Sequence, residues 1–199
     1  ETADIAEGLH IVILVHGLMG NSWDMRLFKN HLACKYPRIR FLCSRANELD
    51  TNRDIGLMGE GLAAEVRTCL EGLQAPIMRL SFVCHSIGGL IVRSCLPLLQ
   101  DYSDKLHTFV SLATPHLGFV HASSALIKTG LWVASKVKKS VSLDQLQLVD
   151  VEEPKESFIF RLASATGLQS FKHVVFVSSC QDQYAPFESA RVELSGRTS

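Results

Sequence analysis

The segment FVCHSIGG, at positions 82–89, contains a serine in a setting suited to nucleophilic catalysis. Strand-forming residues lead into Ser86, and Gly88 and Gly89 follow it at the start of a helix-like pattern. A nucleophile presented on such a tight turn needs small residues two positions before and after it. Gly88 meets this requirement, whereas Cys84 meets it only partly. A serine that caps the following helix is the alternative, and we favour the nucleophile.

A loop that could stabilise negative charge lies upstream, where the apolar run 12–15 ends in HGLMG. In acyl transfer the carbonyl oxygen becomes negative, and fixed backbone N–H groups stabilise that charge. We predict the N–H groups of Leu18 and Ile87 as the donors, with Gly17 in the same binding loop. His16 is predicted to orient this loop, because the catalytic histidine of this arrangement follows the acid along the chain.

The acid of a catalytic triad is predicted at Asp182, directly after the apolar run 174–179. An aspartate at the carboxyl end of a late strand can fix the tautomer and orientation of an imidazole. An aspartate that only forms a turn is the alternative. The competing acids of the segment 119–154 are predicted to be solvated surface charges: Asp144, Asp150, Glu152 and Glu153.

A general base is missing from this pattern, because no histidine occurs between Asp182 and Ser199. We expect it in a longer polypeptide, of which this chain, without an initial methionine, is expected to be a soluble piece. Deleting one member of a triad lowers the rate by orders of magnitude, so the 199 residues alone are predicted to be nearly inactive. The remaining candidates are predicted to be structural: His107, His116, His121 and His173.

Strand-like and helix-like segments alternate along the chain, which predicts an α/β doubly wound sheet of mostly parallel strands buried on both faces. Asn21 and Ser22 are predicted to cap the first helix, and Pro97 lies near the end of the third. The predicted strands are 10–15, 39–43, 78–83, 106–112 and 173–178, and the predicted helices are 23–34, 57–73, 87–98 and 158–165.

The segment 119–154 interrupts this alternation and is predicted to be either a helical cap over the site or an ordinary surface helix. Its lysines Lys136, Lys138 and Lys139 follow an apolar run, so a weak hypothesis is contact with anionic membrane lipids. The segment ATPHLG, at 113–118, is expected at the rim of the site.

Length and composition fit one domain over residues 1–199, because 47% of the residues are hydrophobic. Basic and acidic residues number 20 each, so no electrostatic footprint for nucleic acid exists. The six cysteines form no CxxC pair or zinc-type cluster and are interpreted as buried free thiols in a reducing, cytoplasmic setting. Neither a signal peptide nor a membrane-spanning run is found.

Taken together, these motifs resemble the lipase-like serine esterases of the α/β-hydrolase superfamily, and among them the proteins called "family with sequence similarity 135". TPHxG itself recurs among lipases. The matching stretches are VHGLMGNSWDMRLFK, SRANELDT, LSFVCHSIGGLIVRS, KLHTFVSLATPHLG, TGLW with SKVKKS, and TGLQSFKHVVFVSSCQDQYAPFESAR.

The resemblance implies hydrolysis of carboxylic esters, of lipids above all, through an acyl-serine intermediate on Ser86, with Asp182 as the acid and no metal or organic cofactor. Cys84 departs from the family pattern, which has glycine there, and the absent histidine is the second departure. Two alternatives stay open: a catalytically silent interaction module with the hydrolase fold, and a thioesterase or protein deacylase that uses the same triad. Oligomeric state is not readable from the sequence.

Overall fold

A five-stranded, all-parallel sheet forms the centre of the computed structural model, which describes residues 8–119 and 140–193. The strand order is β2-β1-β3-β4-β5, so each predicted strand is confirmed to within two residues. In the register of the sheet, Val15 lies opposite Cys84 and Leu112 lies opposite Val177, which aligns the carboxyl ends of the strands along one edge. The strands are β1 Leu9–Val15, β2 Arg40–Cys43, β3 Ile77–His85, β4 Leu106–Leu112 and β5 His173–Val177.

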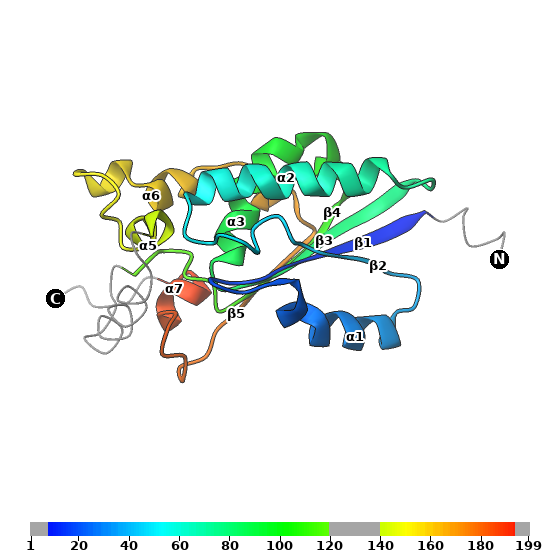
Figure 1. The fold of residues 1–199 in the computed structure, drawn as a ribbon, viewed down its shortest axis with the longest axis horizontal. Coiled ribbons are helices and arrows are strands. Elements are labelled where there is room, and N and C mark those ends of the chain that lie inside the picture. The colour runs from blue at the N-terminus through cyan, green and yellow to red at the C-terminus, as the bar shows by residue number, and fades with distance from the viewer. Residues whose placement is uncertain (1–7, 120–139, 194–199) are drawn as a thin grey trace.

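Helices lie on both faces of this sheet, with α2 and α3 on one side and α1 on the other (Figure 1). The α-helices are α1 Arg26–Lys35, α2 Ile55–Glu71, α3 Gly88–Cys95, α5 Val141–Leu146, α6 Phe158–Ala163 and α7 Phe187–Arg191. The 3₁₀ helices are η2 Ser22–Met25, η3 Leu96–Lys105, η4 Pro154–Glu156 and η5 Leu168–Ser170.

Two apolar layers account for the continuous apolar runs of the sequence. In β1, Ile11, Ile13 and Val15 are buried in the large core beneath α2 and α3, whereas Val12 and Leu14 belong to the smaller cluster on the α1 side. Both faces of the strand therefore exclude water, as expected of a parallel sheet. The predicted α/β doubly wound architecture is confirmed.

Helix boundaries differ from the predicted ones where a single residue caps or bends the chain. Asp54 begins α2 two residues early, because its Oδ1 accepts a hydrogen bond from the N–H of Leu57 at 3.0 Å. The predicted third helix begins at Gly88 and passes into η3 at Leu96, where Pro97 stands in the first turn. Asn21 caps η2 as predicted, accepting from the N–H of Trp23 at 2.9 Å.

Of the predicted insertion, residues 120–139 lie outside the described part of the chain, and His121 and the three lysines of the membrane hypothesis lie with them. The remainder forms α5, which contacts α2 and α6 and buries Leu143 and Leu146. Asp150 is not simply solvated as predicted, because its Oδ2 accepts from the N–H of Phe158 at 2.8 Å.

The cysteines are free thiols, but the prediction that they are buried is wrong for several of them. Cys84 and Cys95 are buried, while Cys34 and Cys180 are exposed on the surface. Within the described ranges, no helix is long and apolar enough to cross a membrane.

Candidate active site

Ser86 follows the last residue of β3 and precedes α3. The backbone conformation of Ser86 makes this turn tight. Its φ is 53°, a left-handed conformation that disfavours an L-residue by about 1–2 kcal/mol. Its N–H donates to the carbonyl of Leu112 at 2.9 Å, and its carbonyl accepts from the N–H of Gly89 at 3.1 Å. These two bonds fix the turn, and the half-buried serine lies between two strand ends.

Gly88 and Gly89 are required by the close approach of neighbouring loops to the start of α3. A Cβ on Gly88 would lie 2.6 Å from the carbonyl oxygen of His16, and one on Gly89 would lie 2.3 Å from Oγ1 of Thr114. Both distances are shorter than any van der Waals contact. The loops after β1 and β4 therefore pack directly on the helix that follows Ser86.

Cys84, which departs from the small-residue pattern, does not prevent this turn from forming. Its side chain is fully buried in the core on the α2 and α3 side, with Sγ 3.2 Å from the carbonyl oxygen of Val110. Burial raises the pKa of this thiol well above its usual range, so Cys84 stays protonated and is no competing nucleophile.

The loop after β1 lies beside Ser86 and forms a tight turn over Gly17–Gly20. A Cβ on Gly17 would lie 3.0 Å from Cβ of Ser86, and the N–H of Gly20 donates to the carbonyl of Gly17 at 3.0 Å. Among the described residues, no acceptor is found for the N–H of Leu18 or of Ile87. Both N–H groups thus lack an acceptor in the part of the chain that the structure describes, one in the residue after Ser86 and one in the loop beside it.

His16 is buried beneath this loop and contacts its backbone. Its Nδ1 lies 3.0 Å from the carbonyl oxygen of Gly17, and its Nε2 has no partner among the residues described. Such a contact fits the predicted orienting role, which stays a prediction.

Asp182 follows β5 on the same carboxyl edge, one strand beyond β4 from Ser86. Its Oδ1 accepts from the N–H groups of Tyr184 at 2.8 Å and Ala185 at 3.0 Å. These bonds are the ones a turn-forming aspartate makes, so the alternative to the acid role has structural support. The structure therefore places Asp182 at the edge of the sheet that carries Ser86, and its role as the acid stays a prediction.

His116 is buried and fully engaged, in line with the structural role predicted for it. Its Nε2 lies 2.8 Å from Oγ of Ser111, and Nη1 of Arg93 lies 3.3 Å from its Nδ1. A guanidinium can only donate, so Nδ1 accepts and Nε2 carries the proton. Burial, and then the charge of Arg93, lower the pKa of His116 to about 3.

His107 is the second residue of β4 and His173 the first residue of β5, so both lie at the amino edge of the sheet, which is the end opposite Ser86. Their ring centroids lie 5.2 Å apart. Neither is placed to act on the serine, which agrees with their predicted structural role. Within the described ranges, no three His, Cys, Asp or Glu side chains lie close enough to hold a metal ion.

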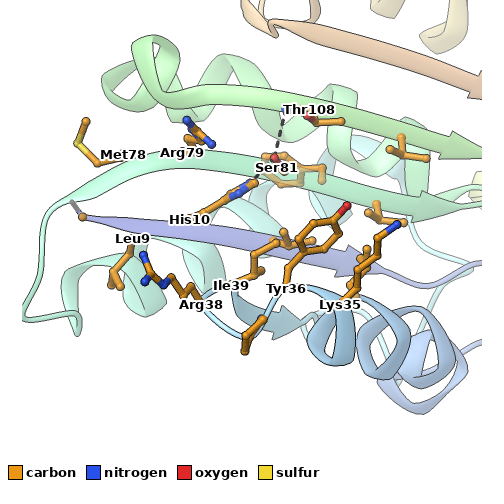
Figure 2. Close-up of a pocket in the computed structure, with 17 residues that line it drawn as sticks. Leu9, His10, Lys35, Tyr36, Arg38, Ile39, Met78, Arg79, Ser81 and Thr108 are labelled. Atoms are coloured by element: carbon orange, nitrogen blue, oxygen red, sulfur yellow. Dashed lines mark hydrogen bonds between the residues drawn. The ribbon is translucent and has the colours of Figure 1, made fainter. Parts of the chain in front are cut away.

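A hollow of about 1020 Å³ lies between α1 and the first halves of β1, β3 and β4. Figure 2 shows His10, Arg79, Lys35 and Tyr36 around it, with His10 Nε2 2.8 Å from Oγ of Ser81. Burial, followed by repulsion from His107 and Arg79, lowers the pKa of His10 to about 4. Because the hollow faces α1 and begins at the amino edge, it is separate from Ser86.

Sequence reasoning missed Thr51, which contacts the loop beside the serine. Its Oγ1 accepts a hydrogen bond from the N–H of Met19 at 2.7 Å. Its only signal was a place in the polar segment SRANELDT, which by itself assigns no role.

Comparison with known protein families assigns the sequence of this chain to one of them. Residues 6–195 match the family described as "Putative serine esterase (DUF676)". The chain belongs to this family. Membership in DUF676 confirms the resemblance to lipase-like serine esterases.

A curated relative and two solved structures are also similar to this chain. A yeast protein, "Putative lipase ROG1" of Saccharomyces cerevisiae, is 27% identical over 194 residues, which cover 91% of this chain and 28% of that protein. Aspergillus fumigatus lipase B superposes with a TM-score of 0.60 at 17% identity, over 92% of this chain and 43% of the lipase. Bacillus licheniformis lipase BlEst2 gives 0.54 at 19%, over 84% and 65%. These likenesses confirm the α/β-hydrolase fold.

Proposed function

We propose that this DUF676 chain carries the nucleophile and oxyanion donors of a hydrolase that cleaves carboxylic esters, lipid esters above all. One observation supports it most: Ser86 stands in a left-handed turn between β3 and α3, beside a loop in which the N–H of Leu18 has no acceptor among the described residues. Strained residues held in place by their surroundings are concentrated at functional sites. The lipase name of the yeast relative supports the lipid part of the proposal.

In the proposed reaction, Oγ of Ser86 attacks the ester carbonyl carbon, and a general base takes the hydroxyl proton. The N–H groups of Leu18 and Ile87 donate to the oxygen that becomes negative in the tetrahedral intermediate. The intermediate collapses, the alcohol leaves with the proton from the base, and water then cleaves the acyl-serine. Asp182 holds the base, which the chain order Ser, Asp, His of this fold requires to be a histidine later in sequence.

A catalytically silent interaction module remains a second candidate, because one observation favours it. Oδ1 of Asp182 is already occupied by the N–H groups of Tyr184 and Ala185. A module of this kind would keep the sheet and the turn at Ser86 but would show no turnover.

Hydrolysis of p-nitrophenyl butyrate and octanoate by a polypeptide extended past residue 199 to the next histidines tests the proposal. Ser86→Ala is expected to lower kcat/KM by about 10³-fold or more, because nucleophile and base act as a unit. Ser103→Ala, which alters an exposed serine of η3, is the matched control and is expected to leave the rate unchanged. Equal, negligible rates in the unmodified and Ser86→Ala proteins would favour the interaction module.

A further inference from the structure

The turn that carries Leu18 is held from outside by Thr51. The hydroxyl oxygen of Thr51 accepts from the N–H of Met19 at 2.7 Å, across 32 positions of sequence. Thr51 is buried, whereas the side chain of Met19 is 57% exposed. The hydrogen bond from the backbone N–H of Met19 to the Thr51 hydroxyl, and not burial of the methionine side chain, therefore anchors the middle of the turn.

Met19 occupies a conformation that needs such an anchor. Its φ is 54°, at the third position of the turn Gly17–Gly20. Positive φ there is usual for glycine or asparagine in type II turns and disfavours a methionine by about 1–2 kcal/mol. The N–H of the third residue belongs to the middle peptide of the turn, so an acceptor facing it fixes the orientation of that peptide. The Thr51 hydroxyl is that acceptor.

Thr51 is itself immobilised by α5. Oγ of Ser142 donates to the carbonyl oxygen of Thr51 at 2.9 Å, and the N–H of Ser142 donates to that of Asn52 at 3.3 Å. Ser142 is fully buried. A second contact from the same polar segment reaches the far end of the loop, where Oε1 of Glu48 accepts from the N–H of Ser22 at 2.7 Å.

We propose that Thr51 is a positioning residue for the oxyanion site: its hydroxyl holds the Met19 peptide, and thereby the N–H of Leu18, against Ser86. This role rests on the function proposed above. Because the oxyanion donors act on charge that develops only in the transition state, losing the clamp slows the chemical step and leaves substrate binding nearly intact.

Two substitutions at Thr51 distinguish the effect of the hydroxyl group from the effect of side-chain volume. Thr51→Val removes the acceptor at nearly constant shape, and Thr51→Ser keeps it. Thr68→Val is the matched control, because Oγ1 of Thr68 donates to the carbonyl of Ala64 within α2, away from the site.

The kinetic test uses the extended polypeptide and p-nitrophenyl butyrate. Thr51→Val is expected to lower kcat at least about tenfold with KM unchanged, approaching the 10²–10³-fold of deleting an oxyanion donor. Thr51→Ser and Thr68→Val are expected to stay within about threefold of the unmodified protein, a modest change beside those values. An unchanged kcat in Thr51→Val, a rise in KM alone, or equal losses in the valine and serine variants would overturn the role.

Amide hydrogen exchange of Met19 tests the clamp without catalysis, in the 199-residue chain. We expect faster exchange in Thr51→Val and unchanged exchange in Thr51→Ser, since only the valine variant loses the acceptor; unchanged exchange in both would refute the clamp. If the unmodified extended protein shows no Ser86-dependent turnover, the proposed function fails and the catalytic role of Thr51 fails with it. Faster exchange of the Met19 amide in Thr51→Val would in that case still show that the Thr51 hydroxyl binds this N–H.

Discussion

Among single residues, three with a left-handed backbone conformation lie along the carboxyl edge of the sheet, after the ends of neighbouring strands. Met19, Ser86 and Ala113 follow β1, β3 and β4, with φ of 54°, 53° and 52°. Each is bonded to another segment: Met19 to Thr51, Ser86 to Leu112, and Ala113 to Val177. Strain of this kind persists only where the surroundings fix it, which is the setting that a preorganised site requires.

The stability of the folded chain is expected to depend on pH through His116, because burial and then the charge of Arg93 lower the pKa of this residue to about 3. Unfolded, His116 binds a proton near pH 6.5; folded, it stays neutral until about pH 3. Between these values the unfolded state holds more protons, so the free energy of unfolding falls by up to about 1.4 kcal/mol per pH unit as pH decreases.

Urea unfolding of the unmodified chain and of His116→Gln, measured from pH 7 to 5, checks this dependence. The variant is expected to be less stable at pH 7 and to lose less stability on acidification, by about 2 kcal/mol at pH 5. Parallel slopes for the two proteins would contradict the assignment.

At the scale of elements, the contact between α2 and α3 positions the helix that follows Ser86. Gly59 of α2 meets α3 so closely that a Cβ would lie 2.7 Å from Oγ and 2.8 Å from Cβ of Ser94. On the same helix, a Cβ on Gly61 would have no neighbour nearer than 3.8 Å. Gly59 and Gly61 lie in the same helix, but only Gly59 is in close contact with another helix.

Alanine at these two positions gives the element-scale prediction. Gly61→Ala is expected to stabilise the chain by about 0.5–1 kcal/mol, because alanine loses less backbone entropy in a helix. Gly59→Ala gains the same entropy but forces α3 away, and is expected to destabilise the chain by about 1–3 kcal/mol. Thermal unfolding monitored by circular dichroism measures both, and equal effects would refute close packing as the reason for Gly59.

The strands and the longer helices were predicted well because their signal is local, whereas α7 was not predicted. Burial on both faces makes strands such as β1 apolar throughout, and the parallel order follows from the alternation with helices. The position of Ser86 was readable from the strand before it and the glycines after it. The bond between Thr51 and Met19 was not, because it joins segments 32 positions apart, and periodicity carries no information on such contacts.

At the scale of the whole molecule, the two faces of the sheet are unequally covered. On the α1 side, Val175 and Val177 of β5 are 43% and 44% exposed, next to their partners Val110 and Leu112 of β4. In Figure 1, α1 lies below β1 and β2. β5 is the edge strand at the other end of the order β2-β1-β3-β4-β5. Parallel sheets are ordinarily covered on both faces, so these side chains form an exposed apolar patch.

The whole-molecule prediction is that this patch binds apolar dyes. The 199-residue chain is expected to enhance the fluorescence of anilinonaphthalene sulfonate, and joint Val175→Thr and Val177→Thr substitution is expected to reduce that enhancement markedly. Val149→Thr, at an exposed valine outside the sheet, is the control and is expected to change little. Equal fluorescence for the double variant and the unmodified chain would place the dye elsewhere.

Ser86 is proposed to form the acyl-enzyme, and covalent labelling of that residue is the decisive test. The extended polypeptide is treated with an alkyl fluorophosphonate, digested, and analysed by mass spectrometry for the modified peptide. The proposal predicts one phosphonylated residue, Ser86, with loss of p-nitrophenyl butyrate hydrolysis in proportion to labelling and no label in Ser86→Ala. Esterase activity that persists in Ser86→Ala, or a label on another residue that tracks the loss of activity, would contradict it.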